Sequence, residues 1–374
     1  MAKKQEPKIP VTVLGAGVTG LTTACILQNR GYQVTVVSRA FPGNPDVDPI
    51  YTSPAAGAHW RSYAANDDYR GQEWDELTFQ TLLRLCSVPG TGLMIAPGYE
   101  FWAEKPDVWQ DPFFARFIPK YQRLEAEALP QGCKFGISYE TVCINVPKYL
   151  PWLLDQFLYL GGKTEERDVS HIDELFQGKH AANVVVNCTG FGARTLPGVA
   201  DGHVYPTRGQ IVQVFAPHVR HTVTRLGTMH EDFTYIIPRD DGIVVLGGTY
   251  QADNHSLEAD PKTADDIIER CLAICPELKP EGKSLEIVAH KVGLRPTRVG
   301  GTRCEAEWRE LDNGRKVLLV HSYGHGGYGY QSSYGSAATV TKIVDSELAQ
   351  QRASARAASN GAAAGRGRGG NAKL

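Results

Sequence analysis

The sequence predicts an α/β protein with a doubly wound, Rossmann-like dinucleotide-binding domain and a second domain built on a mixed or antiparallel sheet. A β-branched strand at residues 11–14 runs into Gly15-Ala16-Gly17-Val18-Thr19-Gly20, and a helix and a second strand at residues 32–37 follow. Glycines at this spacing allow a tight turn and let backbone N–H groups approach a pyrophosphate at the helix N-terminus. The second domain is predicted by apolar segments between residues 209 and 248, with a hairpin turn at residues 240–242.

The composition is that of an ordinary globular protein, and the net charge argues against nucleic acid and anionic membranes as partners. The 374 residues suffice for about two domains, with 42% hydrophobic and 21% charged residues. A formal net charge of −2 gives no electrostatic reason to expect nucleic acid or an anionic membrane as a partner. No apolar run approaches the roughly 20 residues of a membrane span, and the polar N-terminus does not fit a secretory signal. We therefore expect a soluble protein that is not secreted by that route.

The eight cysteines are predicted to be free thiols of a reducing compartment. They are scattered, without a Cys-x-x-Cys pair and without histidines at zinc spacing. Cys271 and Cys275 would lie one turn apart on a helix, which leaves a metal role open for this pair. No other ligand is in sight, so we expect no metal.

Periodicity and turn residues place the remaining elements. Helical spacing is seen at residues 73–86, 149–160 and 264–275, and strand patterns at residues 183–187, 210–215, 234–238, 242–248, 286–294 and 316–321. The strand at 183–187 leads to Thr189 and Gly190, which is typical of a parallel strand whose carboxyl end faces a ligand. We assign residues 1–58, 145–198 and 288–349 to the dinucleotide-binding domain, and residues 59–144 and 199–287 to the second domain.

The last segment, residues 350–374, is predicted to be a flexible tail. Up to Asn371 it consists almost entirely of Ala, Gly, Arg, Ser and Asn, and it lacks the apolar side chains needed to order itself. The chain then ends in Ala372-Lys373-Leu374, a close variant of the peroxisomal Ser-Lys-Leu address. A flexible arm with this ending predicts recognition by the peroxisomal import receptor and a location in the peroxisome matrix.

The end of the second strand bears on which dinucleotide binds. An acidic residue usually contacts the adenosine ribose there, but this chain has Val37-Ser38-Arg39. Arg39 could hold the 2′-phosphate of NADP, stack over adenine or meet a diphosphate. On these residues, an NADP-dependent dehydrogenase and a flavoprotein both remain open.

Glycine- and aromatic-rich segments of the C-terminal half carry a family resemblance. Residues 290–298 and 321–331, together with residues 235–238 and 247–250, resemble segments of the D-amino-acid oxidase family, in the right order within residues 9–348. The resemblance, closest to the fungal-type members, implies non-covalent FAD on the doubly wound domain, with the second domain covering the reacting face of the flavin. The family also includes D-aspartate oxidases, and a homodimer is one oligomeric state that it allows.

The resemblance also implies which residues contact FAD. The diphosphate would lie against the glycine-rich turn, the adenosine beside the second strand, and the flavin between small-residue segments. An acidic residue is common in the family where this chain has Arg39. The implied contacts are Gly15, Ala16, Gly17, Val18, Thr19, Gly20, Ser38, Arg39, Ser53, Ala56, Gly57, Ala58, Val169, Thr189, Gly190, Arg295, Gly326, Gly329, Tyr330 and Gln331.

For the substrate, the resemblance implies a carboxylate clamp. A planar guanidinium binds a carboxylate through two charge-assisted hydrogen bonds, which is the role of Arg295, and Tyr235 and Tyr250 add hydroxyls. The carbonyl of Gly327 would accept from the substrate amine, with Gln331 helping through water. Hydride transfer from the α-carbon to flavin N5 would give an imino acid, then a 2-oxo acid and ammonia, and oxygen would be reduced to hydrogen peroxide.

The preference between neutral and acidic substrates is inferred from the lack of a cation in the segment that ends in Tyr250. The segment that would face a second substrate carboxylate ends in the neutral phenol of Tyr250, so burying that carboxylate would leave its desolvation unmatched. We expect neutral D-amino acids rather than D-aspartate, although Arg239 or a residue between 61 and 139 could supply a cation. A non-catalytic flavin-binding scaffold is a further hypothesis, against which the clamp argues. For His59 and His325, contact with the flavin edge and a structural role both stay open.

Overall fold

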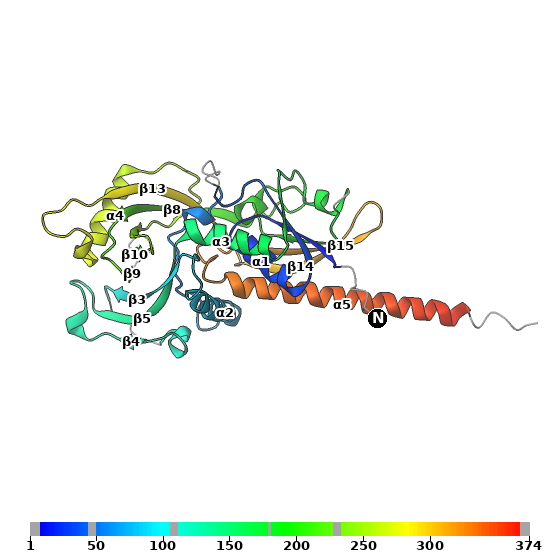
Figure 1. The fold of residues 1–374 in the computed structure, drawn as a ribbon, viewed down its shortest axis with the longest axis horizontal. Helices are drawn as coiled ribbons and strands as arrows, with labels where there is room; N and C mark the ends of the chain where they lie inside the picture. The colour runs from blue at the N-terminus through cyan, green and yellow to red at the C-terminus, as the bar shows by residue number, and fades with distance from the viewer. Residues whose placement is uncertain (1–7, 44–49, 105–110, 179–180, 227–232, 367–374) are drawn as a thin grey trace, which may run out of the picture.

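Two β-sheets form the two halves of the computed structural model, which describes residues 8–43, 50–104, 111–178, 181–226 and 233–366 (Figure 1). The first sheet has the strand order β14-β15-β7-β1-β2-β6. All neighbouring pairs in it are parallel except β14 with β15. Its strands are β1 (Pro10–Leu14), β2 (Gln33–Ser38), β6 (Lys163–Glu166), β7 (Val184–Asn187), β14 (Arg303–Glu310) and β15 (Lys316–Tyr323).

The strand order of the first sheet reverses at β1. The chain passes from β1 through α1 (Val18–Arg30) to β2 on one side, and β7 joins β1 on the other side. Open α/β sheets bind ligands at the carboxyl ends of the strands at such a switch point. The predicted βαβ unit and the buried strand at residues 183–187 are therefore confirmed, and they place the glycine-rich turn at the ligand-binding edge.

The second sheet is mixed, as predicted, and has the order β12-β8-β11-β10-β9-β3-β5-β4 with β13 paired to β8. The hairpin between β10 and β11 is confirmed, and β3 runs parallel to β9. Helix α4 (Pro261–Ile274) packs on β8, β10 and β11. The strands are β3 (Leu93–Trp102), β4 (Gln122–Arg123), β5 (Phe135–Ile144), β8 (Val204–Phe215), β9 (Thr222–Leu226), β10 (Thr234–Pro238), β11 (Ile243–Gly247), β12 (Gln251–Ala252) and β13 (Ile287–Arg298).

The predicted domain boundary at residue 288 does not match this strand pairing. Strand β13 pairs antiparallel with β8 over its length, so it belongs to the second sheet and not to the dinucleotide-binding domain. Its side chains show no regular alternation of buried and exposed positions, and its place is set by the partner strand. The consequence for the site is that Arg295 is carried by the second sheet.

One hydrophobic core joins the two halves. Helices α1 and α3 (Val146–Tyr159) pack together, and α5 (Ser333–Arg366) packs on α1 and on α2 (Tyr69–Leu85). The buried cluster contains Leu21 and Val340 from the first half together with Trp60, Phe79 and Tyr139 from the second. Because the core is continuous, the two sheets hold a fixed relation at the site between them.

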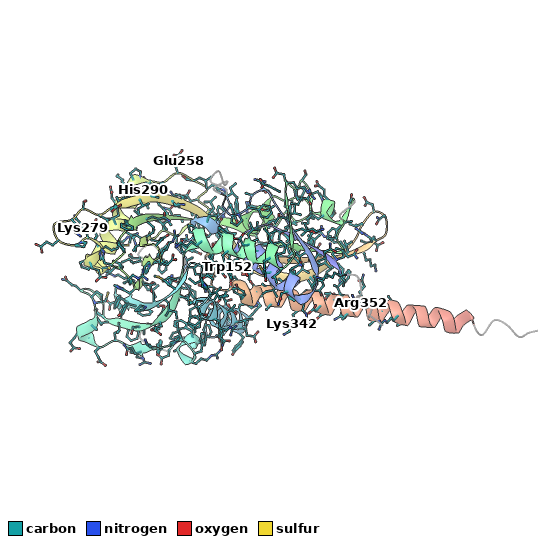
Figure 2. All side chains as sticks on the ribbon, viewed as in Figure 1. Trp152, Glu258, Lys279, His290, Lys342 and Arg352 are labelled. Atoms are coloured by element: carbon teal, nitrogen blue, oxygen red, sulfur yellow. The ribbon has the colours of Figure 1, made fainter. Side chains whose placement is uncertain are left out.

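The prediction of a flexible segment from Gln350 is wrong up to Arg366, because α5 continues to that residue. Alanine and arginine have high helix propensity, which outweighs the lack of apolar contacts. The side chains of residues 351–357 are exposed, and α5 extends beyond the body of the molecule, where Figure 2 labels Arg352. Residues 372–374 lie outside the described residues. None of the helices described here is apolar over enough of its length to cross a membrane.

Candidate active site

A cavity of about 820 Å³ runs between the two sheets. At one end it is lined by the glycine-rich turn after β1 and by the carboxyl ends of β2 and β7. At the other end it is lined by aromatic and basic side chains, of which Tyr235 and Arg295 come from strands of the second sheet and the others from loops. Its volume lies within the range of about 300–1,000 Å³ that is usual for ligand pockets. The cavity thus connects the predicted dinucleotide site with the predicted substrate site.

The glycine-rich turn presents backbone to the cavity. Gly15, Ala16, Gly17, Val18 and Thr19 line it, and the N-cap residue of α1, Gly17, makes no side-chain cap. The prediction that Gly20 contacts the cofactor is not supported, because Gly20 does not line the cavity. A Cβ atom at Gly20 would lie 1.9 Å from the backbone oxygen of Gly15, so this glycine keeps the helix close to the turn.

A carboxylate compensates the unexpected arginine at the adenosine end. Ser38 and Arg39 line the cavity, and Arg39 Nε lies 2.5 Å from Asp168 Oδ1. Asp168 also lines the cavity, beside Val169, and it was missed from the sequence because it comes from the segment after β6. An acidic group is thus present beside the end of β2, where it is supplied by the segment after β6 and paired with Arg39. Thr189 and Gly190 complete this end.

Small-residue segments and a glycine-rich loop line the middle of the cavity. The first segment contributes Ser53, Ala56, Gly57 and Ala58, and the loop contributes Gly326, Gly327, Gly329, Tyr330 and Gln331. The two segments are linked, because the Tyr330 hydroxyl donates to the Ser53 carbonyl at 2.9 Å. Gln331 Nε2 donates to Asp75 Oδ2 at 3.0 Å, so this hydrogen bond uses the amide nitrogen of Gln331 and not its side-chain oxygen. Tyr51, a lining residue that sequence reasoning missed, donates to the Ala16 carbonyl at 2.5 Å.

Two histidines offer unpaired polar atoms to the cavity. His59 and His325 both line it, and the Nε2 atom of each is buried without a hydrogen-bond partner among the described residues. Burial lowers the pKa of each imidazole to about 4, so both are neutral at pH 7. Buried polar atoms in native proteins are normally paired. A polar ligand such as FAD fits this middle section, since it would supply partners to these two atoms.

Arg295 faces the cavity without a counter-ion. Its Nη1 atom donates to the Thr249 carbonyl at 2.9 Å, and no carboxylate lies within ion-pair distance of it among the described residues. A Cβ atom at position 209 would lie 2.4 Å from Nη1, so the glycine on the paired strand β8 makes room for the guanidinium. A partly buried cation with free donors is the arrangement that binds a carboxylate of a ligand.

The two predicted tyrosines flank Arg295, and Gly327 lies beside it. Tyr235 is buried, and burial raises the pKa of its phenol while Arg295 opposes the rise. The ring of Tyr250 lies 5.8 Å from the Arg295 guanidinium and is 37% exposed, which places it at the rim. All four residues line the cavity, so the predicted substrate group is brought together.

Two arginines could supply a cation for a second substrate carboxylate, and the structure places them differently. Arg239 is buried but does not line the cavity, and its Nη2 atom donates to the Ala56 carbonyl at 3.1 Å. Arg61 does line the cavity, where it forms an ion pair with Glu100. The alternative that a residue between 61 and 139 supplies a cation to the cavity is therefore met by Arg61, whose charge is compensated by Glu100.

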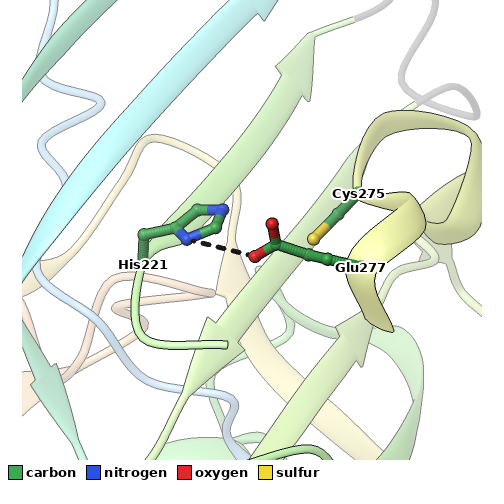
Figure 3. A group of neighbouring side chains, drawn as sticks. All are labelled: His221, Cys275 and Glu277. Carbon is green, nitrogen blue, oxygen red and sulfur yellow. Dashed lines mark ion pairs between the residues drawn. The ribbon is translucent and has the colours of Figure 1, made fainter. Parts of the chain in front are cut away.

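Of the eight cysteines, Cys188 lines the cavity and the other seven do not. All eight are free, as predicted. Cys275 brings its Sγ atom within 4.8 Å of ligand atoms of His221 and Glu277 (Figure 3). His221 and Glu277 already form a pair at 3.6 Å, and burial raises the pKa of Cys275 to about 12. None of the three lines the cavity, and Cys271 is not a member of this group.

The fold and the cavity define a dinucleotide-binding oxidoreductase. Residues 10–343 match the family model described as FAD dependent oxidoreductase. The chain belongs to this family, and its cofactor is FAD rather than NADP.

Individual relatives agree with this assignment. The D-amino-acid oxidase of Schizosaccharomyces pombe is 38% identical over 345 residues, which cover 90% of this chain and 96% of the relative. The D-aspartate oxidase of Cryptococcus neoformans is 32% identical, with 90% of this chain and 97% of the relative covered. The glycine oxidase structure from Bacillus cereus superposes with a TM-score of 0.69 at 18% identity, covering 91% of this chain and 96% of that one. The last comparison supports the fold alone.

Proposed function

We propose that the protein is an FAD-dependent oxidase of D-amino acids with neutral side chains. The observation that carries the proposal is Arg295, a cavity-lining guanidinium that has no carboxylate partner among the described residues and lies beside the buried phenol of Tyr235. A free cation in a desolvated cavity is costly unless a ligand brings a negative charge. The similarity to proteins named D-amino-acid oxidase supplies the class of ligand.

The residues of this chain bind and orient the substrate. Arg295 and Tyr235 hold the α-carboxylate, and the Gly327 carbonyl accepts a hydrogen bond from the amine, which Gln331 supports through water. Bound FAD would supply the acceptor for the hydride of the α-carbon, and its reoxidation by oxygen would account for hydrogen peroxide as a product. Orientation by the clamp is the main contribution of the protein, since holding the reacting atoms in place removes much of the entropic barrier. The imino acid then hydrolyses to a 2-oxo acid and ammonia.

The same arrangement selects one enantiomer. The carboxylate, the amine and the side chain are each assigned a place, and three fixed substituents of a tetrahedral carbon determine the direction of the fourth. The two enantiomers therefore direct the α-hydrogen to opposite sides. We expect turnover of D-amino acids and none of the L-enantiomers.

A D-aspartate oxidase is the second candidate, and one relative carries that name. A second carboxylate would need its own cation in the cavity. Tyr250 is neutral, and Arg61 is already paired with Glu100. These two observations favour the neutral substrates.

A visible absorbance spectrum tests the proposal. The purified protein should show a flavin band that bleaches when D-alanine is added without oxygen. A colourless protein, or a flavin band that D-amino acids leave unchanged, would overturn it; bleaching by NADPH alone would favour a dehydrogenase, and no bleaching by either would favour a scaffold. Comparing kcat/KM for D-alanine, D-phenylalanine and D-aspartate then tests the preference, which a clear advantage for D-aspartate would contradict.

We also propose import into the peroxisome matrix through residues 372–374. The support is the similarity of Ala-Lys-Leu to the Ser-Lys-Leu address, which an import receptor reads at the chain end. Deleting the three residues should leave the activity of the purified protein intact and move the protein to the cytosol in cells. Peroxisomal collection of the truncated protein would contradict the proposal.

A further inference from the structure

Arg61 and Glu100 form a bidentate ion pair in the wall of the cavity. Arg61 Nε lies 2.9 Å from Glu100 Oε1, and Arg61 Nη2 lies 2.7 Å from Glu100 Oε2. The side chains are 12% and 1% exposed, so both charges are largely withdrawn from water. Arg61 lines the cavity, whereas Glu100 lies behind it on β3. The cavity is therefore in contact with the cation of a buried pair.

Arg61 is held in its charged form by its surroundings. Burial alone would lower the pKa of Arg61, but Glu100, with Tyr63 and Tyr139, outweighs this and keeps the pKa above its ordinary value. The Tyr139 hydroxyl donates to Glu100 Oε1. His59, beside the pair, is neutral because burial lowers its pKa to about 4. The group as a whole thus brings no net charge to the cavity.

Aromatic side chains connect Arg61 with the carboxylate clamp. The Arg61 guanidinium lies 4.0 Å from the centre of the Tyr63 ring. That ring is 5.5 Å from the ring of Tyr328 and 6.2 Å from that of Phe233, and the Phe233 ring is 5.4 Å from that of Tyr235. All five residues line the cavity. A substrate whose α-carboxylate is clamped beside Tyr235 can therefore extend its side chain between these rings toward Arg61.

The hydrogen-bond partners of Arg61 define what it offers to a substrate. A guanidinium has five N–H donors. Glu100 takes two of them, and the Ser62 carbonyl takes a third from Nη1 at 2.7 Å. A neutral substrate side chain would contact an Arg61 whose positive charge is already balanced by Glu100. A substrate carboxylate would share one cation with Glu100, and two buried anions on one cation leave a negative charge uncompensated.

We propose that the Arg61–Glu100 pair determines the substrate side chain that the enzyme accepts, with Glu100 excluding acidic D-amino acids by neutralising Arg61. The inference rests on the proposed oxidase function. The proposal assigns the discrimination between neutral and acidic substrates to Glu100, a carboxylate that does not itself line the cavity. Glu100 is accordingly a positioning and charge-compensating residue, and Arg61 is the group that the substrate side chain meets.

Glu100→Gln tests the proposal, because glutamine keeps the shape of the side chain and removes its charge. D-Aspartate and D-asparagine are the matched substrates, since they differ in charge and hardly in size. We expect the ratio of kcat/KM for D-aspartate over D-asparagine to rise at least about tenfold in Glu100→Gln, mainly through a lower KM for D-aspartate. Because the measured quantity is a ratio for two substrates of one enzyme, a general change of activity in the variant does not alter it.

Two further variants isolate the charge. Tyr139→Phe removes the hydroxyl that donates to Glu100 without changing any charge at neutral pH, and it should leave the ratio within about twofold of the wild type. The double variant Arg61→Gln/Glu100→Gln removes both charges, and the gain for D-aspartate should disappear. A ratio unchanged in Glu100→Gln, or a gain that persists in the double variant, would overturn the proposal.

The wild-type enzyme supplies a measurement that does not depend on the folding of a variant. It should oxidise D-asparagine with a KM at least about tenfold below that for D-aspartate. Preference for D-aspartate would overturn the role of the pair while leaving the oxidase function standing. Failure to oxidise any D-amino acid would overturn the oxidase function and this inference with it, so the two failures are distinguishable.

Discussion

Replacing Arg295 by alanine removes the cation that the proposed function depends on. Arg295 donates to the Thr249 carbonyl and interacts with the Tyr235 hydroxyl, but it has no carboxylate partner among the described residues, so further donors are available to a substrate. Truncating one partner of a buried charged pair costs about 2–5 kcal/mol. A loss of about 3 kcal/mol corresponds to a fall of roughly 150-fold in kcat/KM. We expect KM to rise steeply and kcat to fall, because the clamp both binds and orients the substrate.

The assay is steady-state oxygen uptake with D-alanine, together with the flavin absorbance of the same sample. Flavin should remain bound in Arg295→Ala, so a loss of rate can be assigned to the clamp. Lys291→Ala is the matched control, since Lys291 is an exposed cation on the same strand β13 and does not line the cavity. A flavin-loaded Arg295→Ala enzyme with kcat/KM near that of the wild type would refute the reasoning, because the carboxylate would then be held elsewhere.

Three further predictions concern the turn, a buried carboxyl group and a tyrosine. Gly20→Ala places a Cβ atom 1.9 Å from the Gly15 oxygen, so flavin content and melting temperature should both fall, whereas Gly202→Ala, which meets nothing within 4 Å, should change neither. Burial raises the pKa of Asp75 from 3.8 to about 7, so between these pH values the folded protein retains a proton that the unfolded chain has released, and stability is lost as pH rises from about 4 to 7. Asp75→Asn should therefore raise the melting temperature by on the order of 5 °C more at pH 8 than at pH 5. Equal shifts at both pH values would contradict this. Tyr235→Phe removes one hydroxyl from the clamp and should lower kcat/KM for D-alanine about fivefold, in line with about 1 kcal/mol for one hydrogen bond, and an unchanged value would remove Tyr235 from the clamp.

The parts of the fold that follow from local backbone requirements could be predicted from the sequence. The turn at residues 15–20 needs glycine for its close approaches, and this requirement is visible in the sequence itself. The β10–β11 hairpin is likewise fixed by its turn residues. The substrate group around Arg295 was located through its family motifs, and the cavity lining agrees with it.

Features that depend on contacts between distant segments could not be predicted. Arg39 meets Asp168 across 129 positions, and Arg61 meets Glu100 across 39 positions, so neither counter-ion is evident from the residues around the arginine. Strand β13 lacks an alternating pattern, and its membership of the second sheet depends on β8. The continuation of α5 to Arg366 escaped prediction for the opposite reason: composition suggested disorder, whereas intrinsic propensity is sufficient to continue a helix already anchored by its first turns.

The distribution of counter-ions explains why the cavity suits a ligand with one carboxylate at its substrate end. Four arginines line the cavity within the described part of the chain: Arg39, Arg61, Arg167 and Arg295. Three of them have a carboxylate partner at 3.3 Å or less. Arg39 pairs with Asp168, Arg61 with Glu100, and Arg167 with both Glu165 and Glu174. Only Arg295 of these four has none. A ligand anion at Arg295 gains a full ion pair, whereas an anion at Arg61 must compete with a carboxylate that is already buried and bidentate. The cavity thus favours a single negative charge on the substrate, at the point where its α-carboxylate is expected.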